Sequence, residues 1–397
     1  MNRLITYFIF AVRIQHALSW ALPHPPSIPQ AQQQKPMFGA AYSPGSEDDD
    51  DYSDVDIVDR RQFQGSHTYA NLPHVDCLSG AEAEKGQRYD IAILGAPFDT
   101  ANCDGRYALL HIKTWADIGG DRPSPGGPGA RYGPSGIRTG SQRIHGGDYS
   151  IYTGKSILDR WATIVDCGDA PLTWLDNKYA LRQLDKAHRV VSGRKASNES
   201  HSVTPRIVTF GGDHTTTLSA LRSVHQRWGP VSPHRRLNHA TFLHIANEEH
   251  LISNTSIHAG TRGPIFRAPE DVRNDVRCGF AMIRARDLDK IGTDGVIRQI
   301  KDRVGDSKVY ISVDIDVLDP AFAPATGTAE PGGWSTRELL TILDGLQGLS
   351  VVGADVVEVA PIYDNPGETT VLAAAEVTLS LIELMVENPV KSLADTI

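Results

Sequence analysis

Five short apolar segments recur along the chain, and each ends in a turn that contains glycine, proline or acidic residues. They are DIAILGAPFD (90–99), ATIVDCGD (162–169), RIVTFGGDH (206–214), KVYISVDIDVLDP (308–320) and VVGADVVEVAP (351–361). Segments with helical patterns lie between or after them, at residues 215–228, 335–346 and 369–387. This alternation predicts an α/β fold in which helices cover both faces of a parallel sheet. The carboxyl ends of such strands are where open α/β sheets place their functional sites.

The first 87 residues differ in character from the rest. Residues 1–21 have a basic residue, an apolar run too short to span a membrane and a small-residue cleavage pattern, which favours a secretory signal peptide. A mitochondrial presequence is the alternative, because Arg13 interrupts the apolar run and no acidic residue precedes Glu47. Residues 22–87 are predicted to be a low-complexity acidic linker, with the run EDDDDYSDVDIVD at 47–59. The folded domain is expected to occupy residues 88–397.

The composition excludes several classes of protein. A formal net charge of −9 argues against a nucleic-acid partner and against an anionic-membrane partner, since both require a concentrated basic face. The four cysteines are far apart and form no CxxC pair, which excludes a zinc ribbon and a dense disulfide framework.

Two aspartates in SVDIDVLDP are candidate metal ligands. Asp314 and Asp316 are two residues apart on a predicted strand, so both side chains should lie on the same face. Two carboxylates that converge at a buried strand end repel each other unless a cation lies between them.

A histidine and a glutamate follow two other predicted strands. The glycines of GGDH (211–214) allow a tight strand-to-helix turn, which would place His214 at the mouth of the sheet. With Asp314 and Asp316 it would form a mixed nitrogen and oxygen site suited to Mn²⁺, Zn²⁺ or Fe²⁺. Glu358 offers a carboxylate suited to pairing with a guanidinium.

Several motifs together resemble the ureohydrolase (arginase/agmatinase) family, and among its members the agmatinases. They are GAPFD (95–99), GARYGPSGIR (129–138), DCGD (166–169), GGDH (211–214), NTSIHAGTRGP (254–264), SVDIDVLDPAFAPATGTAEPGG (312–333) and DVVEVAPIYD (355–364). The resemblance covers about residues 88–390. It implies a three-layer α/β/α fold with a central, mainly parallel sheet. It also implies a homo-oligomer and two Mn²⁺ ions, which activate a hydroxide that attacks a guanidinium carbon and releases urea.

The resemblance also implies roles for individual residues. His214, Asp314 and Asp316 match metal ligands, and Glu358 matches the carboxylate that pairs with the guanidinium of a small-molecule substrate. His239, in NHATF, matches a catalytic histidine that shuttles a proton or orients the substrate. Agmatine is the expected substrate, with putrescine and urea as products.

The chain departs from the family pattern at two places. An Asp-Ala-His-x-Asp run, which supplies three metal ligands in the family, is absent from the sequence, and its strand is predicted to be absent between Ser232 and Leu237. Residues 103–128 form an insertion, which a surface loop accommodates at little cost. A retained intron and a skipped exon would explain both departures, and the sequence of the transcript would test that hypothesis.

Nearby histidines offer a poor substitute for the lost ligands. His234, His239 and His244 are spaced five residues apart, which places them on a common face of neither a helix nor a strand. Two hypotheses therefore remain open. The chain is either an agmatinase-like hydrolase or a non-catalytic relative that binds at most one metal ion.

Overall fold

The computed structural model describes residues 67–79, 87–99, 129–229, 232–234, 240–262, 273 and 276–396. All of these residues belong to the unit Asp51–Ile397. The predicted signal peptide, the acidic run at 47–59, the insertion at 103–128 and His239 lie outside the described residues.

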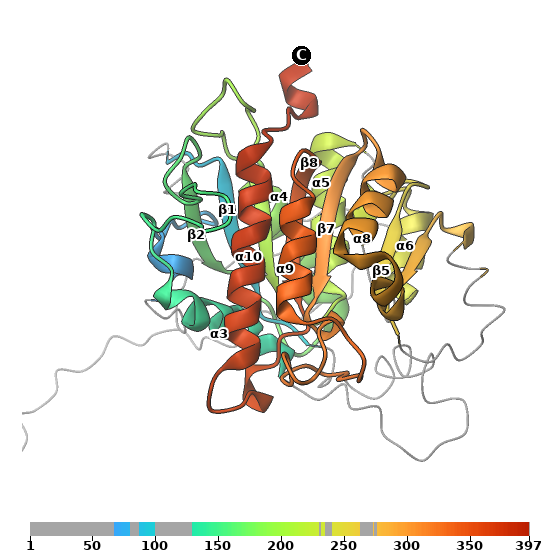
Figure 1. Cartoon of the computed structure of the whole chain (residues 1–397). Helices are drawn as coiled ribbons and strands as arrows, with labels where there is room; N and C mark the ends of the chain where they lie inside the picture. Colours follow the sequence, from blue (N-terminus) through green and yellow to red (C-terminus); the bar gives the residue numbers. More distant parts are fainter. Residues whose placement is uncertain are drawn as a thin grey trace, which may run out of the picture. The chain divides into compact units, whose positions relative to one another are not determined.

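The described part of the chain is organised around one eight-stranded sheet (Figure 1). Every pairing between neighbouring strands is parallel. In spatial order the strands are β2 (Ile164–Asp169), β1 (Ile91–Ala96), β3 (Arg206–Gly211), β8 (Ser350–Val357), β7 (Lys308–Asp314), β4 (Ser232–His234), β5 (Ile257–Thr261) and β6 (Ala281–Arg284). The five apolar segments form β1, β2, β3, β7 and β8, as predicted.

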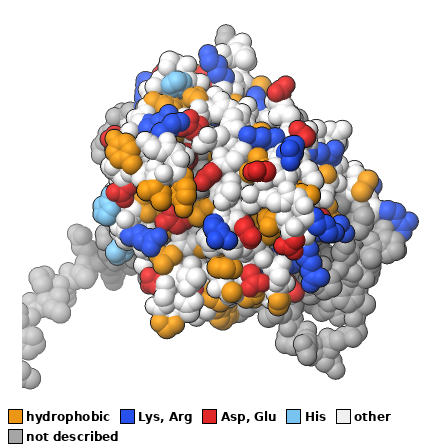
Figure 2. Space-filling view, in the orientation of Figure 1, with side chains coloured by type: hydrophobic (Ala, Val, Ile, Leu, Met, Phe, Trp, Pro, Cys, Tyr) orange, Lys and Arg blue, Asp and Glu red, His pale blue; other side chains and the backbone are white. Residues whose placement is uncertain are grey.

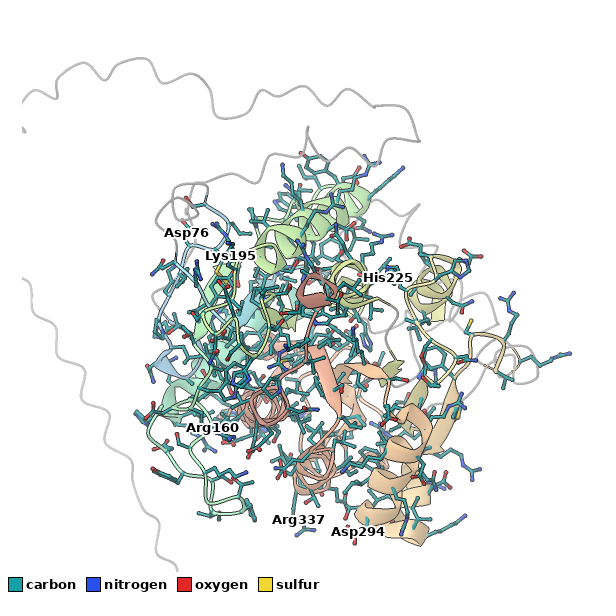
Figure 3. All side chains as sticks on the ribbon, turned by 90° about the horizontal axis from the view of Figure 1, so that it is seen from above. Asp76, Arg160, Lys195, His225, Asp294 and Arg337 are labelled. Carbon is teal, nitrogen blue, oxygen red and sulfur yellow. A yellow bond between two sulfur atoms is a disulfide. The ribbon has the colours of Figure 1, made fainter. Side chains whose placement is uncertain are left out.

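Helices cover both faces of this sheet (Figures 1 and 3). One layer contains α4 (Asn177–Ser192), α5 (Thr216–Trp228) and α6 (Ala240–Glu248), and the other contains α8 (Leu288–Val304), α9 (Thr336–Gly345) and α10 (Thr369–Glu387), with α3 (Gly133–Gly140) against α10. Side-chain caps fix the first residues of two of these helices. The Asp176 side chain accepts a hydrogen bond from the Tyr179 N–H at the start of α4, and Ser335 and Glu338 form a capping box at the start of α9. The prediction of a three-layer α/β/α fold is confirmed.

Helix α10 is the most apolar helix of the front layer. It is long enough and apolar enough to cross a membrane by length and composition, with a mean hydropathy of 1.6. However, 78% of its apolar window is buried inside the protein. We therefore regard it as a core helix that packs on the sheet.

Residues 67–79 were predicted to belong to the low-complexity linker, and that assignment is wrong. Tyr69 is completely buried, its backbone N–H donates to Asp166 Oδ2 at 2.8 Å and its hydroxyl donates to the Ala375 carbonyl at 2.8 Å. Cys77 forms a disulfide with Cys167 in β2. This segment is therefore part of the folded unit, upstream of the boundary predicted at residue 88.

The strand predicted to be absent is present in shortened form. Strand β4 has three residues and lies between β7 and β5, with Ser232 opposite Val309 and His234 opposite Ile257. The backbone edges of β7 and β5 are therefore bridged, and the sheet is continuous at this point. The carboxyl end of β4 leads into residues 235–239, which lie outside the described residues.

The described residues on either side of the predicted insertion, Asp99 and Gly129, lie side by side. The buried Asp99 carboxylate accepts hydrogen bonds from the Gly129 N–H at 3.0 Å and from Arg131 Nη2 at 2.6 Å. One side chain thus joins the described segments that precede and follow the insertion. This arrangement is expected where residues are added to an existing loop.

His188, on the buried side of α4, links stability to pH. Burial lowers its pKa from 6.5 to about 3, and its ring Nε2 lies 3.5 Å from the Thr209 hydroxyl. The unfolded chain binds a proton on this residue below pH 6.5 that the folded protein does not bind. The contribution of the neutral ring to stability is therefore complete above pH 6.5 and is lost as the pH falls toward about 3.

We expect the free energy of unfolding to fall by about 2 kcal/mol between pH 7.5 and pH 5 because of His188 alone. In His188→Gln this component should disappear, which urea denaturation at the two pH values would measure. His225→Gln is the control, since His225 is a partly exposed histidine of α5 (Figure 3). An unchanged pH dependence in His188→Gln would contradict the assignment.

Candidate functional site

Three neighbouring strands end at the same edge of the sheet. Strand β8 lies between β3 and β7, and all three are parallel, so their carboxyl ends converge. His214 follows β3, Glu358 follows β8 and Asp314 is the last residue of β7. The fold therefore brings together three residues that are far apart in the sequence.

The turn after β3 can be made only with glycine. A Cβ atom on Gly212 would lie 1.7 Å from the Phe98 carbonyl oxygen, which no side chain tolerates. This close approach lets the Gly212 N–H donate to the Ala96 carbonyl and the Asp213 N–H donate to the Phe98 carbonyl. The turn is thereby held against the end of β1, with His214 two residues before the start of α5.

Hydrogen bonds determine how the His214 ring is oriented. Ser312 Oγ donates to Asp355 Oδ1 at 2.6 Å, so it is an acceptor for His214 Nε2, which lies 3.0 Å away. We infer that Nε2 carries the proton and that Nδ1 presents a lone pair. Histidine ligands of metals are usually held in this way, through the second ring nitrogen.

His214 and Asp314 form a pair of donor atoms suited to a cation. His214 Nδ1 lies 3.2 Å from Asp314 Oδ2, and both side chains are almost completely buried. A nitrogen lone pair and a carboxylate oxygen at this distance repel each other unless a proton or a metal ion lies between them. The pair therefore fits a resident divalent metal ion with nitrogen and oxygen ligands.

The structure corrects the predicted position of Asp316. Strand β7 ends at Asp314, and Asp316 lies in the following 3-10 turn η6 (Ile315–Val317), so the two aspartates do not alternate along one strand. Asp314 Oδ1 accepts a hydrogen bond from the Asp316 N–H at 3.0 Å, and Asp316 Oδ2 accepts one from the Thr328 hydroxyl at 2.6 Å. Both aspartates are buried, as expected for ligands.

The three predicted ligands are not gathered as one cluster. Within the described residues, no group of three or more His, Cys, Asp or Glu side chains is arranged closely enough to hold a metal ion. The structure brings together His214 and Asp314, while the Asp316 carboxylate is directed to Thr328. His239 cannot be placed because it lies outside the described residues.

Glu358 is placed beside His214 by the backbone as well as by its side chain. It adopts a left-handed conformation with φ of 63°, and its N–H donates to the Gly212 carbonyl at 2.9 Å. Its Oε1 accepts a hydrogen bond from the His214 N–H at 2.8 Å, and the residue is 8% exposed. The carboxylate is thus held in a fixed position at the edge of the site.

Arg262 supports the site and was not singled out from the sequence. It follows β5, and its Nη2 donates to the carbonyls of Asp316 at 2.6 Å and Glu330 at 2.6 Å. Burial lowers the pKa of Arg262, whereas the negative charge of Asp314 opposes that shift. Its position in the NTSIHAGTRGP motif was the available signal, because a charged residue directly after a buried strand needs partners.

Comparison with known proteins agrees with this geometry. The family model described as "Arginase family" matches residues 89–383. The chain is 44% identical over 359 residues to a protein of Schizosaccharomyces pombe named "Putative agmatinase 1", which covers 83% of this chain and 84% of the relative. It is 34% identical over 331 residues to proclavaminate amidinohydrolase of Streptomyces clavuligerus, which covers 80% of this chain and 94% of the relative.

A solved structure shows the same arrangement of elements. Proclavaminate amidinohydrolase from Streptomyces clavuligerus matches with a TM-score of 0.64 and 30% identity, over 82% of this chain and 98% of that chain. The strand order, the GGDH turn and the matched residues lead to one assignment. The chain belongs to the arginase family of ureohydrolases.

Proposed function

We propose that the protein hydrolyses the guanidino group of a small molecule, with agmatine as substrate and putrescine and urea as products. The observation that carries this proposal is the buried pair His214 and Asp314 beside the fixed carboxylate of Glu358. The choice of agmatine is supported by the names of the relatives from Schizosaccharomyces pombe.

The residues of the site divide into two roles. His214 and Asp314, with Asp316 behind them, would hold Mn²⁺, and Ser312 and Asp355 keep His214 Nδ1 available as a ligand atom. When bound, Mn²⁺ lowers the pKa of water and so supplies the strong nucleophile that a guanidinium carbon requires. Reorienting the Asp316 carboxylate away from Thr328 would add a further oxygen ligand.

Glu358 binds and orients the substrate in this proposal. A buried carboxylate pairs with a guanidinium through charge-assisted hydrogen bonds, and such pairs are shorter and stronger than neutral ones. Because the His214 N–H holds one of its oxygens, the Glu358 carboxylate cannot rotate away from the site. We assign to His239 the transfer of a proton to the leaving amine.

The alternative is a non-catalytic relative that binds at most one metal ion. It is favoured by one observation, the absence of an Asp-Ala-His-x-Asp run from the sequence. The residues that follow β4 would have carried those ligands, and the short sequence Arg235-Arg236-Leu237-Asn238 contains no carboxylate or histidine. The two proposals differ in the number of metal ions bound and in turnover.

We expect the full chain, purified with added Mn²⁺, to release urea from agmatine and to contain about two Mn²⁺ ions per chain, since two ions share the activation of one water in this chemistry. A colorimetric urea assay and elemental analysis would measure the two quantities. Turnover would exclude the non-catalytic alternative. No turnover together with at most one Mn²⁺ per chain would instead reject the hydrolase.

Asp314→Asn should lower kcat/KM for agmatine by at least about a hundredfold, because the amide keeps the shape of the side chain but removes the charge that holds the cation. The Asp316 N–H can still donate to the amide oxygen, so the turn should persist. Asp306→Asn is the matched control, since Asp306 is exposed and precedes the amino end of the same strand. Equal kcat/KM values for the two variants would contradict a role for Asp314 as a ligand.

Glu358→Gln should lower kcat/KM by roughly 10- to 100-fold, mainly through a higher KM, because a neutral amide binds a guanidinium less strongly than a carboxylate does. The Gln oxygen can still accept from the His214 N–H, so the metal content should not change. Glu199→Gln, at an exposed position in a different part of the fold, should behave like the unmodified protein. A variant with unchanged KM and lost Mn²⁺ would show that Glu358 acts on the metal site instead.

A further inference from the structure

A cavity of about 420 Å³ lies outside the sheet, between α9, α10 and the segment 143–158. It shares no residue with the candidate site at the carboxyl edge of the strands. Its size is within the range of sites that hold small molecules. The face drawn in Figure 2 includes α9 and α10 and shows hydrophobic side chains intermixed with acidic and basic ones.

One wall of this cavity is set by helical spacing. Side chains three, four and seven residues apart share a face of a helix, and the four cavity residues of α10 follow that spacing. The two cavity residues on α9 are four positions apart in the sequence, so they also share one face of their helix. The residues are Glu376, Leu379, Ser380 and Glu383 on α10, and Leu340 and Asp344 on α9.

Glu383 is the most informative residue of the cavity. It is only 5% exposed, and its Oε1 atom has no hydrogen-bond partner among the residues that the structure describes. A buried carboxylate oxygen without a partner is costly, and its usual explanation is a role in binding. Asp344 lies against the same cavity, and its Oδ1 accepts a hydrogen bond from the Ser380 hydroxyl at 3.1 Å.

The other charged residues of the cavity are paired with each other or exposed to solvent. Arg143 Nη2 lies 3.0 Å from Glu376 Oε1, and His145 Nδ1 lies 3.6 Å from Asp148 Oδ2. Glu383 and Asp344 differ from these groups because they are buried or half-buried and have no Arg or Lys partner within 4 Å among the residues that the structure describes, whereas Asp148 is exposed to solvent. The cavity therefore favours a ligand that carries two positive charges.

The apolar part of the lining defines the ligand further. Leu340 and Leu379 lie against the cavity beside the two carboxylates. Tyr149 and Tyr152 also line it and are 71% and 85% exposed, so their rings are accessible to a cation. A metal ion would require converging oxygen atoms, whereas here each carboxylate has a leucine one helical turn away in the same lining, which matches a hydrocarbon chain that carries ammonium groups.

We propose that this cavity is a binding site for a small aliphatic diamine, whose ammonium groups pair with Glu383 and Asp344 and whose methylene groups contact Leu340 and Leu379. The site is separate from the proposed hydrolysis and does not depend on it. A diamine bound there would contact both α9 and α10.

The protonation behaviour of the two carboxylates agrees with this proposal. Burial raises the pKa of Asp344, although the Ser380 hydroxyl opposes the shift. Burial also raises the pKa of Glu383. The Thr153 hydroxyl and the charge of Lys155 oppose that shift, whereas the negative charge of Asp344 adds to it. Both carboxylates would gain from a cation that stabilises their charged forms.

The test is calorimetric titration of the full chain with 1,4-diaminobutane, and with 1-aminobutane and Mg²⁺ as comparison probes. The diamine should bind at least tenfold more tightly than the monoamine. Glu383→Gln and Asp344→Asn should each raise the Kd for the diamine at least tenfold. Glu368→Gln, the same change at an exposed position at the start of α10, should leave it unchanged.

Two further variants separate the possible explanations. Leu340→Trp should abolish diamine binding by filling the cavity while both carboxylates remain, which keeps the test valid if a carboxylate variant fails to fold. Asp314→Asn should leave the Kd unchanged. Binding that is lost in Asp314→Asn but retained in Glu383→Gln would place the diamine at the candidate site and overturn the proposal. Mg²⁺ binding that competes with the diamine and needs Glu383 would also overturn it, in favour of a metal site.

Discussion

The buried carboxylate of Asp355 is the constraint on which the centre of the molecule depends. It is completely buried in β8 and accepts hydrogen bonds from the hydroxyls of Thr217 at 2.7 Å, Tyr310 at 2.8 Å and Ser312 at 2.6 Å. A buried charge that loses such partners costs several kcal/mol, so all three hydroxyls must remain in place. Asp355 thereby joins α5, β7 and β8, and it sets Ser312 opposite itself in the register of the two strands.

The candidate site inherits its geometry from this network. Because Ser312 donates to Asp355, its oxygen accepts the hydrogen bond from His214 Nε2–H, and His214 Nδ1 is left facing Asp314. The orientation of a candidate ligand is therefore set, through Ser312, by a carboxylate that is itself completely buried in β8. Arg262 acts similarly at the other side of the site, where it holds the backbone carbonyls that follow β7. Such supporting contacts are what fix ligand geometry in metal sites.

Sequence patterns predicted the elements of the fold well and the details of the site less well. Continuous apolar runs located β1, β3 and β8, since strands buried on both faces need apolar side chains throughout. The convergence of His214, Asp314 and Glu358 could be anticipated because parallel strands end at one edge. The prediction that Asp314 and Asp316 alternate along one strand was wrong, because the strand ends at Asp314 and the backbone turns at Ile315–Val317. A run of three residues is too short to show any periodicity, which is why β4 was not recognised.

What the sequence determined by itself was the fold class, the family and the residue types available for chemistry, because these follow from local patterning and from motifs that are contiguous along the chain. Only the tertiary structure decided the tautomer of His214, the packing of Tyr69 under α10, the Cys77–Cys167 disulfide and the cavity with Glu383. Each of these depends on contacts between segments distant in sequence, and the free energy of a buried charge or hydrogen bond depends on those contacts and not on the residue alone.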